Sequence, residues 1–404
     1  MVPKLGTGEL KMKILFISHD ASRTGATIVL LNFLKWIKNN TNISFEIIIK
    51  MKSGSAMLSE FKSLAPVIIF SDTVVGRLYY FLSFLERFHI QIPWIFRLKR
   101  YLSSGMNLNK FDLIYSNTIT NSEVLSLLPN DGPPVICHVH ELEWGIQYYG
   151  ISKFNMTKKF SDRFIAVSKA VRENLTRNHG IAPDAVELNY EFIPIKILSK
   201  IDEPNARKIV RQEFGMDENS VVICGSGTTG WRKGPDLFIQ LAFQVIKQVK
   251  ERSVFFLWVG GQKSGLERNN LLYDIKKSGI SNSIRFISEK ENPFTYFAAS
   301  DIFAMVSRED PFPLVCLEAA ALGKPILCFD QAGGMKEFVE KDAGFVVPYL
   351  DISTMAIRCV DLIESPELRN KMGRKAFDKV SQRHDLSVAG PQLLKIIKET
   401  IDAQ

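Results

Sequence analysis

The sequence predicts an α/β fold with two parallel-sheet domains of similar size. Short apolar runs alternate with longer amphipathic stretches along the chain, and this alternation begins a second time near its middle. Runs that are apolar at every position are typical of strands buried on both faces, as in parallel sheets covered by helices. The 404 residues suffice for two hydrophobic cores, since a domain holds roughly 100–200 residues. Two Rossmann-like domains are therefore expected.

Each series supplies six expected strands. In the first series they are Lys13–Ser18, Phe45–Lys50, Val67–Phe70, Leu113–Ser116, Val135–His138 and Arg163–Val167. In the second series they are Val221–Gly225, Val254–Gly260, Ile284–Ile287, Ile302–Val306, Pro325–Phe329 and Gly344–Val347. A helix is predicted over Ala26–Lys38, where apolar residues recur on one face.

The predicted domain boundary lies between the two series, at Asn189–Pro204. Pro194 and Pro204 interrupt the pattern there, and no clear helix is expected. The first domain is accordingly predicted over residues 1–195 and the second over residues 196–385. An amphipathic helix is predicted at Leu386–Ile401, within the last segment, 386–404. Residues Met1–Lys11 show no apolar period and are expected to be an appendage.

Composition excludes several classes of protein. With 46% hydrophobic and 23% charged residues the chain is ordinary for a globular protein, which excludes disordered, collagenous and disulfide-scaffold classes. The five cysteines form no CxxC pair, so we expect buried thiols, a reducing compartment and no structural zinc. No apolar run approaches the roughly 18 residues of a membrane span, and Ile14–Ser18 is too short for a signal peptide. A cytoplasmic protein is predicted.

Positive charge is concentrated in the first quarter of the chain. Residues 1–100 contain 14 Lys and Arg against six Asp and Glu, whereas the remaining residues contain 37 of each sign. A basic region of this kind indicates an anionic partner, such as a phosphate group or a membrane surface. Nucleic acid is not expected as a partner, because the sequence contains no zinc finger, helix-turn-helix or RNP motif.

The segment Ser307–Pro325 carries the most specific chemical signal. A helix is predicted to begin near Pro313–Leu314, because proline suits the first helical position, and to stop at Gly323. The free N–H groups of such a helix start form an anion site suited to a diphosphate. Glu318, one turn further, can accept two hydrogen bonds from ribose hydroxyls, and Asp310 precedes the turn. The expected ligand contacts in the turn are Phe312, Pro313, Leu314 and Val315.

A second segment, Val221–Gly234, combines a strand, a glycine-rich turn and a basic pair. Gly225 and Gly227 let a ligand approach the backbone, while Arg232 and Lys233 supply positive charge against phosphate. Basic residues at a helix start are more often solvated surface, but the glycines beside this pair favour a phosphate site.

In two segments of the first domain, polar residues stand at the end of an expected strand. Ile136–Glu143 contains His138 and His140, which the alternation of a strand places on the same side of the sheet. A histidine at a strand end is either structural or part of a site, and the sequence leaves both open. Ile14–Ala26 leads from a strand through Gly25 into a helix.

Taken together, these segments resemble the retaining GT-B glycosyltransferases of the group 1, or family 4, type. The stretch from Asp310 to Glu318 is similar to the E-x7-E region of that family, whose second acid binds ribose and whose intervening amides take the diphosphate. The resemblance assigns the ribose to Glu318 and a place near the donor sugar to Asp310. Glu309 is the alternative first acid.

The resemblance also assigns roles to the basic pair and to a histidine. Lys233 matches the family's Lys-Gly pair, which neutralises the leaving diphosphate. The arginine that usually precedes this pair corresponds to Gly227, and Arg232 is a candidate replacement. His140, with His138 as the alternative, matches a histidine that faces the donor sugar. Gly25 belongs to the family's N-terminal glycine loop, where Ala26 stands in place of a second glycine.

The rest of the chain follows the same resemblance. The segment Arg285–Glu289 matches the base-recognition position, so Ser288 is an expected donor contact, and uracil and guanine remain open. The resemblance implies the GT-B fold, with two Rossmann-like domains facing across a cleft. It also implies that the C-terminal helix packs back onto the N-terminal domain.

The implied activity is transfer of a sugar, with retention, from a nucleotide-diphosphate sugar to an acceptor hydroxyl in bacterial cell-surface polysaccharide or glycolipid assembly. No cofactor is expected, and the sequence has no Asp-x-Asp triplet that would indicate a metal-bound diphosphate. The acceptor is expected to be a glycan or lipid-linked. A GT-B epimerase or hydrolase and a non-catalytic nucleotide-sugar-binding subunit are the alternatives. A NAD dehydrogenase is disfavoured, because the first turn lacks GxGxxG.

Peripheral contact with an anionic membrane is a further hypothesis. The segment Leu78–Tyr101 mixes aromatic residues with Arg97, Lys99 and Arg100, as do segments that lie on such membranes. The same aromatic residues are equally suited to the core of the first domain.

Overall fold

A computed structural model describes residues 12–52, 54–87, 108–129, 131–290 and 292–403. The chain divides into two compact units, each described here by itself. The N-terminal unit comprises the chain up to Val167, the segment Arg172–Asn189, and the chain from Gly390 onward. The C-terminal unit comprises Ser168–Val171 and Tyr190–Ala389.

The N-terminal unit is built on a seven-stranded, fully parallel sheet with the strand order β3-β2-β1-β4-β5-β6-β7. Buried apolar residues dominate the strands, as a parallel sheet covered on both faces requires. The strands are β1 (Lys13–Ser18), β2 (Ser44–Ile49), β3 (Val67–Ile69), β4 (Leu113–Asn117), β5 (Val135–Val139), β6 (Arg163–Ala166) and β7 (Val186–Leu188).

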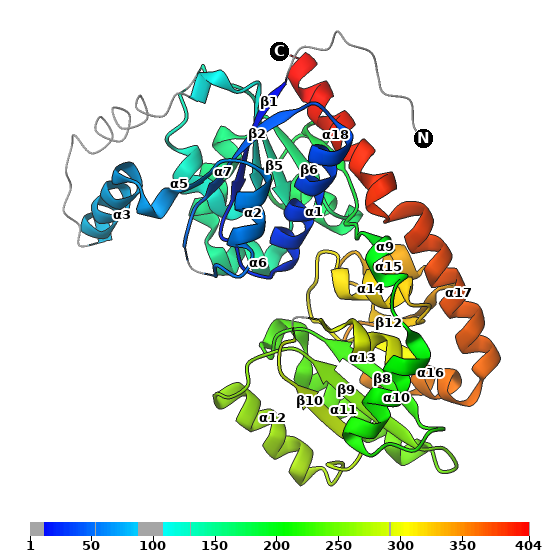
Figure 1. Cartoon of the computed structure of the whole chain (residues 1–404). Coiled ribbons are helices and arrows are strands. Elements are labelled where there is room, and N and C mark those ends of the chain that lie inside the picture. The colour runs from blue at the N-terminus through cyan, green and yellow to red at the C-terminus, as the bar shows by residue number, and fades with distance from the viewer. Residues whose placement is uncertain (1–11, 53, 88–107, 130, 291, 404) are drawn as a thin grey trace. The chain divides into compact units, whose positions relative to one another are not determined.

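Helices α1 and α2 pack side by side in this unit, and α5 packs beside α7 (Figure 1). The chain from Gly390 onward belongs to the same unit, and a Cβ added at Gly390 would lie 3.0 Å from the Trp36 ring of α1. The helices are α1 (Gly25–Asn40), α2 (Leu58–Leu64), α3 (Val74–Arg87), α5 (Ser122–Leu125), α6 (Glu143–Tyr149), α7 (Ile151–Phe160), α8 (Lys169–Glu173, shared between the units) and α18 (Leu386–Asp402, likewise shared).

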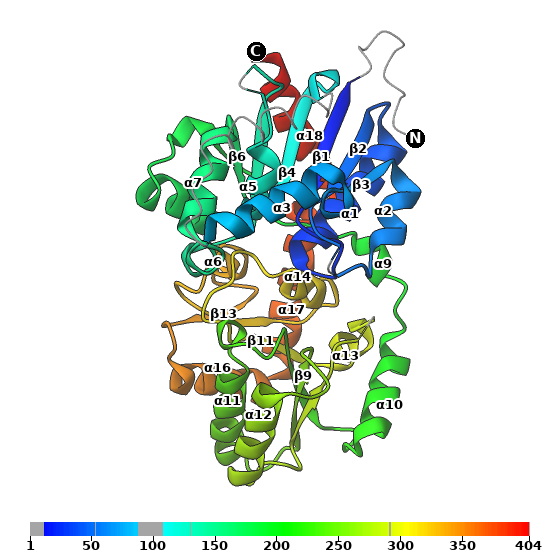
Figure 2. The same ribbon diagram turned by 90° about the vertical axis from the view of Figure 1, so that its left-hand side faces the viewer.

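The C-terminal unit contains a six-stranded parallel sheet with the order β10-β9-β8-β11-β12-β13. Its strands are β8 (Val221–Ser226), β9 (Val254–Val259), β10 (Ile284–Ile287), β11 (Ile302–Met305), β12 (Ile326–Phe329) and β13 (Gly344–Val347). Figure 2 shows α11 and α12 side by side along this sheet. The helices are α9 (Ile195–Leu198), α10 (Glu203–Phe214), α11 (Pro235–Gln248), α12 (Leu266–Lys277), α13 (Phe294–Ala299), α14 (Leu314–Ala321), α15 (Met335–Val339), α16 (Ile352–Glu364) and α17 (Pro366–Arg383).

The twelve expected strands are all present, with ends that differ by one residue in most cases. Strand β7 was not expected, because a run of three residues gives no periodic signal. The prediction that no helix forms over Asn189–Pro204 was wrong, because α9 lies within this segment and α10 begins in it. Pro204 stands in the first turn of α10, where a missing N–H costs nothing, and Asp202 caps that helix by accepting from the Asn205 amide.

All five cysteines are buried free thiols, as predicted. Within the described ranges, no helix combines the length and the apolar character that a bilayer span requires. Met1–Lys11 and the basic residues Arg97, Lys99 and Arg100 lie outside the described residues.

Candidate functional site

Two loops of the C-terminal unit meet where β8 and β9 end. Gly227 has φ +154°, and its carbonyl oxygen accepts a hydrogen bond from Trp258 Nε1 at 3.2 Å. A Cβ added at Gly260 would lie 2.3 Å from the Gly227 oxygen, so this approach of two backbones requires glycine. The sequence predicted that Gly227 lets a ligand approach the backbone. In the structure, the backbone of Gly260 from the neighbouring loop makes this close approach.

The next loop brings a lysine onto the end of β11. Gly234 has φ +72°, and a Cβ there would lie 2.1 Å from the Val306 oxygen, so only glycine permits this contact. Beside it, Lys233 Nζ donates to Asp310 Oδ2 at 2.5 Å, with side-chain exposures of 17% and 7%. Ser307 Oγ also lies 3.5 Å from the same carboxylate oxygen. Two residues that the sequence assigned to one site, 77 positions apart, are therefore in direct contact.

The arginine of the basic pair has a different position. Arg232 donates from its guanidinium to the backbone oxygen of Glu309 at 2.8 Å, and its own carbonyl accepts from the Arg308 amide. Arg308, which sequence reasoning did not single out, forms a two-armed ion pair with Asp236 at 2.6 and 2.9 Å and lies over the Trp231 ring. Both arginines therefore link the loop after β8, which contains Lys233, to the loop after β11.

A third loop, after β12, completes the edge. The Asp310 amide donates a hydrogen bond to the Ala332 oxygen at 2.7 Å, and the Gly334 amide donates one to the Pro311 oxygen at 3.0 Å. A Cβ added at Gly334 would lie 2.6 Å from the Phe312 ring. The pair Gly333–Gly334 was missed by the sequence analysis, although two adjacent glycines in the loop that follows an apolar strand were a usable signal.

The turn Pro311–Pro313 sets the start of α14 as predicted. The Phe312 ring is buried and packs 5.4 Å from the Tyr190 ring and 5.2 Å from the His384 ring, so its side chain is structural. Pro313 has no N–H, and the Cys316 amide donates back to the Pro313 oxygen. Of the predicted contacts in this turn, Leu314 and Val315 therefore retain the helix-start amides suited to an anion.

Glu318 is the acid without a counter-charge at this edge. Burial raises the pKa of its carboxyl to about 7, from an ordinary value of 4.5. Within the described part of the chain, no residue donates a hydrogen bond to it or pairs with its charge. A carboxylate held in this way is suited to accept hydrogen bonds from a ligand.

The charges of Lys233, Asp310 and Glu318 all act on the thiol of Cys316. Burial raises the pKa of Cys316 well above its usual range, Asp310 and Glu318 raise it further, and Lys233 lowers it. The three charged residues of the predicted site are therefore close enough to act on one buried atom. The segments that the sequence assigned to phosphate and ribose therefore lie at the same carboxyl edge of this sheet.

Ser288 also lies at this edge, directly after β10. The adjacent Glu289 donates its amide to the Gly261 oxygen at 2.9 Å, which joins the β10 and β9 loops. Arg285, from the same predicted segment, donates its guanidinium to the backbone oxygens of Ser281 and Ile284, at the opposite end of β10. Only the Ser288 end of this segment is therefore placed with the other site residues.

The N-terminal unit holds a second polar group, at the carboxyl ends of β1, β4 and β5. The rings of His138 and His140 lie 4.2 Å apart, centre to centre, which confirms that both side chains share one side of the sheet. His138 is buried and bonded to the Tyr115 hydroxyl at 2.6 Å, and burial lowers its pKa well below the usual range. His140 Nε2 lies 3.0 Å from Asn117 Oδ1.

Gly25, at the first position of α1, belongs to this second group of residues. The carbonyl of the next residue, Ala26, accepts a hydrogen bond from Asn117 Nδ2 at 2.9 Å. His19, directly after β1, has a lowered pKa because of burial, although Asp20 acts in the opposite sense. Asn117 and His19 were missed by the sequence analysis, because a lone polar residue after a strand has no distinctive spacing.

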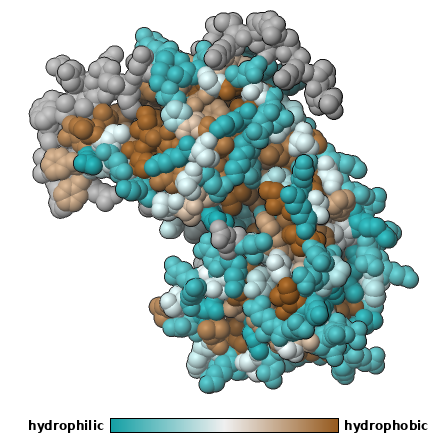
Figure 3. Space-filling view, in the orientation of Figure 1, coloured by the Kyte–Doolittle hydropathy of each residue, from teal (hydrophilic) through white to brown (hydrophobic). Residues whose placement is uncertain are grey.

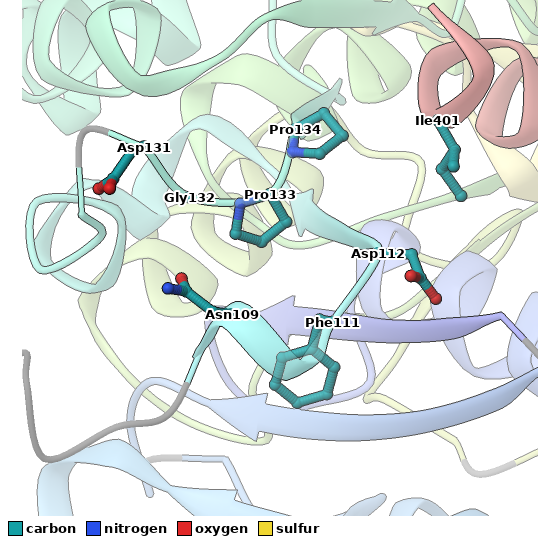
Figure 4. A pocket seen from close by; sticks show the side chains of 8 residues that line it. All are labelled: Asn109, Phe111, Asp112, Asp131, Gly132, Pro133, Pro134 and Ile401. Atoms are coloured by element: carbon teal, nitrogen blue, oxygen red, sulfur yellow. The ribbon is translucent and has the colours of Figure 1, made fainter. Parts of the chain in front are cut away.

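Figure 4 shows an open hollow of about 390 Å³ elsewhere in the N-terminal unit. It is lined by residues that precede β4 and β5, among them Asp112 and Pro134, and by Ile401. It therefore lies at the amino ends of the strands, whereas parallel α/β sheets bind ligands at the carboxyl ends. In the described ranges, no three His, Cys, Asp or Glu side chains are grouped to hold a metal ion.

Two family models match the chain. The model described as "Glycosyl transferases group 1" matches residues 206–379, and the one described as "Glycosyltransferase Family 4" matches residues 58–196. The chain belongs to the group 1 glycosyltransferases. The predicted family is thereby confirmed, and the two parallel-sheet, Rossmann-like domains confirm the predicted α/β fold class.

Relatives of this group 1 chain are similar over part of their length. A D-inositol 3-phosphate glycosyltransferase of Saccharomonospora viridis is 26% identical over 250 residues, covering 60% of this chain and 57% of that protein. An N-acetyl-alpha-D-glucosaminyl L-malate synthase of Bacillus anthracis is 25% identical over 199 residues, or 49% of each chain. The chain thus matches about half the length of these curated relatives.

Solved structures share the whole fold. Anabaena Alr3699/HepE, in complex with UDP and glucose, is 22% identical with a TM-score of 0.76 and covers 96% of this chain and 99% of its own. WaaG, a glycosyltransferase involved in lipopolysaccharide biosynthesis, is 14% identical with a TM-score of 0.68 over 94% and 98% of the two chains. At these identities the likeness establishes the GT-B fold.

Replacing Glu318 with Gln is expected to stabilise the folded protein above neutral pH. The folded carboxyl has a pKa of about 7 against an ordinary 4.5, so the folded state binds its proton more tightly than the unfolded state. Ionisation therefore destabilises the fold increasingly from about pH 4.5, and fully above about pH 7. At about pH 8, Glu318→Gln should raise the free energy of unfolding by up to about 3 kcal/mol.

Urea unfolding at about pH 4 and pH 8 measures this difference, which should vanish at the lower pH. Glu251→Gln, which changes an exposed acid in the same unit, is the matched control and should show no such gain. Equal stability of wild type and Glu318→Gln at both pH values would show that the carboxyl is not held in a desolvated place.

Proposed function

We propose that the protein transfers a sugar from a UDP-sugar to a hydroxyl group of an acceptor. The observation that carries this proposal is Glu318, a desolvated acid without a partner among the described residues, one turn into a helix with open amides. Lys233 stands near the same buried thiol and supplies the positive charge that a diphosphate requires. UDP is favoured because a structure of the same fold, HepE, contains UDP and glucose.

In this reaction the bond between the anomeric carbon and the diphosphate oxygen breaks, and both electrons leave with the diphosphate. A new bond forms from the acceptor oxygen to the anomeric carbon, and the proton of the acceptor hydroxyl passes to the oxygen of the departing diphosphate. Lys233 and the amides of Leu314 and Val315 would stabilise the charge that develops on the leaving diphosphate. Glu318 would hold the ribose by accepting from its hydroxyls.

Asp310 is proposed as the first acid, rather than Glu309. The Asp310 carboxylate is buried and bonded to Lys233. Glu309 instead uses its backbone oxygen, which accepts a hydrogen bond from Arg232. Binding of a diphosphate would compete with Asp310 for the Lys233 ammonium, which would leave the carboxylate near the donor sugar. Arg232 is proposed to support the loop and not to replace the missing arginine of the family.

The family resemblance supports further proposals about individual residues, the stereochemistry and the acceptor. His140 is proposed to hydrogen-bond the donor sugar, and Ser288 to border the base. Retention at the anomeric carbon, which product NMR would reveal, and activity without a metal are proposed too. The acceptor is proposed to be a glycan or lipid-linked, as in cell-surface polysaccharide or glycolipid assembly, although the relatives named above differ in acceptor.

Helix α3 supports a proposed contact with an anionic membrane. Val74, Phe81 and Phe84 are exposed by 79%, 57% and 55% on this one helix. Figure 3 shows hydrophobic residues gathered over it, at the upper left. Large apolar side chains exposed on an amphipathic helix are suited to the interface of a bilayer. The basic first quarter of the sequence is complementary to anionic lipid.

Thermal unfolding with UDP-, GDP-, dTDP- and ADP-sugars, in EDTA, tests the donor. A UDP-sugar at about 100-fold its Kd should add about 2.7 kcal/mol of stability, and Glu318→Ala should abolish the gain while Glu251→Ala keeps it. If no nucleotide sugar stabilises the protein, the transferase proposal fails and a non-catalytic subunit of a glycan assembly is favoured. Rapid hydrolysis or epimerisation of the donor without acceptor would favour the other enzyme class.

Lys233→Ala is expected to lower kcat by about 10²- to 10³-fold, because it removes the charge that stabilises the leaving group. It should also destabilise the fold by about 3–5 kcal/mol, since Asp310 would be left as an unpaired buried charge. The double variant Lys233→Ala/Asp310→Asn should recover stability but not activity. Lys263→Ala, an exposed change in the same unit, is the control; full activity of the double variant would refute the role of Lys233.

Vesicle flotation tests the membrane contact. The protein should float with vesicles that contain phosphatidylglycerol at low salt and less so at high salt, because salt screens the attraction. Phe81→Ser/Phe84→Ser should float less than wild type, whereas Phe377→Ser, an exposed phenylalanine of α17, should not differ. Absence of flotation at both salt concentrations would refute the contact.

A further inference from the structure

We propose that Asn117 is a positioning residue for His140. Its side-chain amide fixes which ring nitrogen of His140 carries the proton, and it ties that ring to the first turn of α1. The effect on catalysis rests on the proposed function. The tautomer itself follows from the geometry of the N-terminal unit alone.

The assignment begins with the Ala26 carbonyl. A carbonyl oxygen can only accept, so the group of Asn117 that lies 2.9 Å from it must be the NH₂ and not the oxygen. The Asn117 oxygen then faces His140 Nε2 at 3.0 Å. Because that oxygen can only accept, Nε2 must carry a hydrogen. A neutral His140 ring is therefore the Nε2–H tautomer, in which Nδ1 is the accepting nitrogen.

The Asn117 amide is held rigidly enough to impose this choice. Asn117 is fully buried and is the last residue of β4, where it pairs with His138 of β5. Asn121 Nδ2 bonds the Asn117 backbone oxygen at 3.0 Å, and also Ile17 and Ser116. The chain then leaves the strand at Thr118, whose φ of +85° is stabilised by the bond from the Thr120 amide to the Thr118 hydroxyl.

The second bond of Asn117 connects two segments that the sequence assigned to the site separately. The Ala26 carbonyl belongs to the first turn of α1, directly after Gly25, whereas His140 follows β5. One amide thus sets both the orientation of the His140 ring and its distance from the glycine turn. The His138 ring, whose centre lies 4.2 Å away at an angle of 47°, further limits rotation of His140.

Nitrogen NMR of the ¹⁵N-histidine-labelled protein tests the tautomer without any substrate. The chain has six histidines, and loss of one signal in His140→Ala assigns the ring. At about pH 8 the wild-type His140 signal should show a protonated Nε2 and an unprotonated Nδ1. A protonated Nδ1 in the wild type would overturn the proposal.

Two substitutions separate the bonds of Asn117. Asn117→Asp keeps an oxygen facing His140 but cannot donate to Ala26, so Nε2 should stay protonated. Asn117→Ala removes both bonds, and the two tautomers should then be mixed. Asn174→Ala is the matched control: it removes another buried amide of the same unit, one that bonds Asn178, and should leave the His140 tautomer unchanged. A tautomer that is the same in Asn117→Ala as in the wild type would refute the positioning role.

Kinetics with the donor identified above give the second readout. Misplacement of the ring should lower kcat of Asn117→Ala by about ten- to hundredfold with little change in the KM of the donor, and Asn117→Asp should recover part of it. Loss of kcat in Asn174→Ala equal to that in Asn117→Ala would mean that Asn117 acts only through stability. If no donor is turned over, the proposed function fails, while the NMR result still decides the tautomer.

Discussion

The ion pair between Lys233 and Asp310 is the interaction on which the donor-side edge of the C-terminal sheet depends. It joins the loop after β8 to the loop after β11, and its 2.5 Å contact is largely shielded from solvent. Gly227 and Gly234 let the first loop lie close enough for it. A pair buried in this way is costly to break unless a new anion takes the place of the carboxylate. The proposed diphosphate is such an anion, so the contact that organises the free site would be exchanged when it binds.

Topology explains why these residues meet. In the C-terminal sheet the strand order reverses between β8 and β11, and in the N-terminal sheet between β1 and β4. At such a switch point the two connections leave in opposite directions and open a space at the carboxyl ends of the strands. Lys233 follows β8 and Asp310 follows β11, while His19 follows β1 and Asn117 ends β4. Each unit therefore places its polar residues where its own sheet has room for a ligand.

The sequence predicted those parts whose signal is local. Apolar runs located twelve strands, and the prolines around Phe312 located the start of α14, because proline constrains its own backbone. The ion pair between Arg308 and Asp236 could not be predicted, since it joins residues 72 positions apart that share no sequence pattern. Asn117 was missed for the same reason. The role of the Phe312 side chain was concealed because its packing partners, Tyr190 and His384, are distant in the chain.

Two carboxylates eight residues apart have opposite surroundings, and this contrast explains the division of labour between them. Asp310 forms a buried ion pair with Lys233. Glu318 lacks such a partner among the described residues, and burial raises its pKa to about 7. Ribose hydroxyls that donate to Glu318 would favour its charged form and lower that pKa again. In the proposed complex, the free-energy cost of holding an unpaired acid at this edge would thus be recovered when the nucleotide binds, which would favour the donor over water as the occupant.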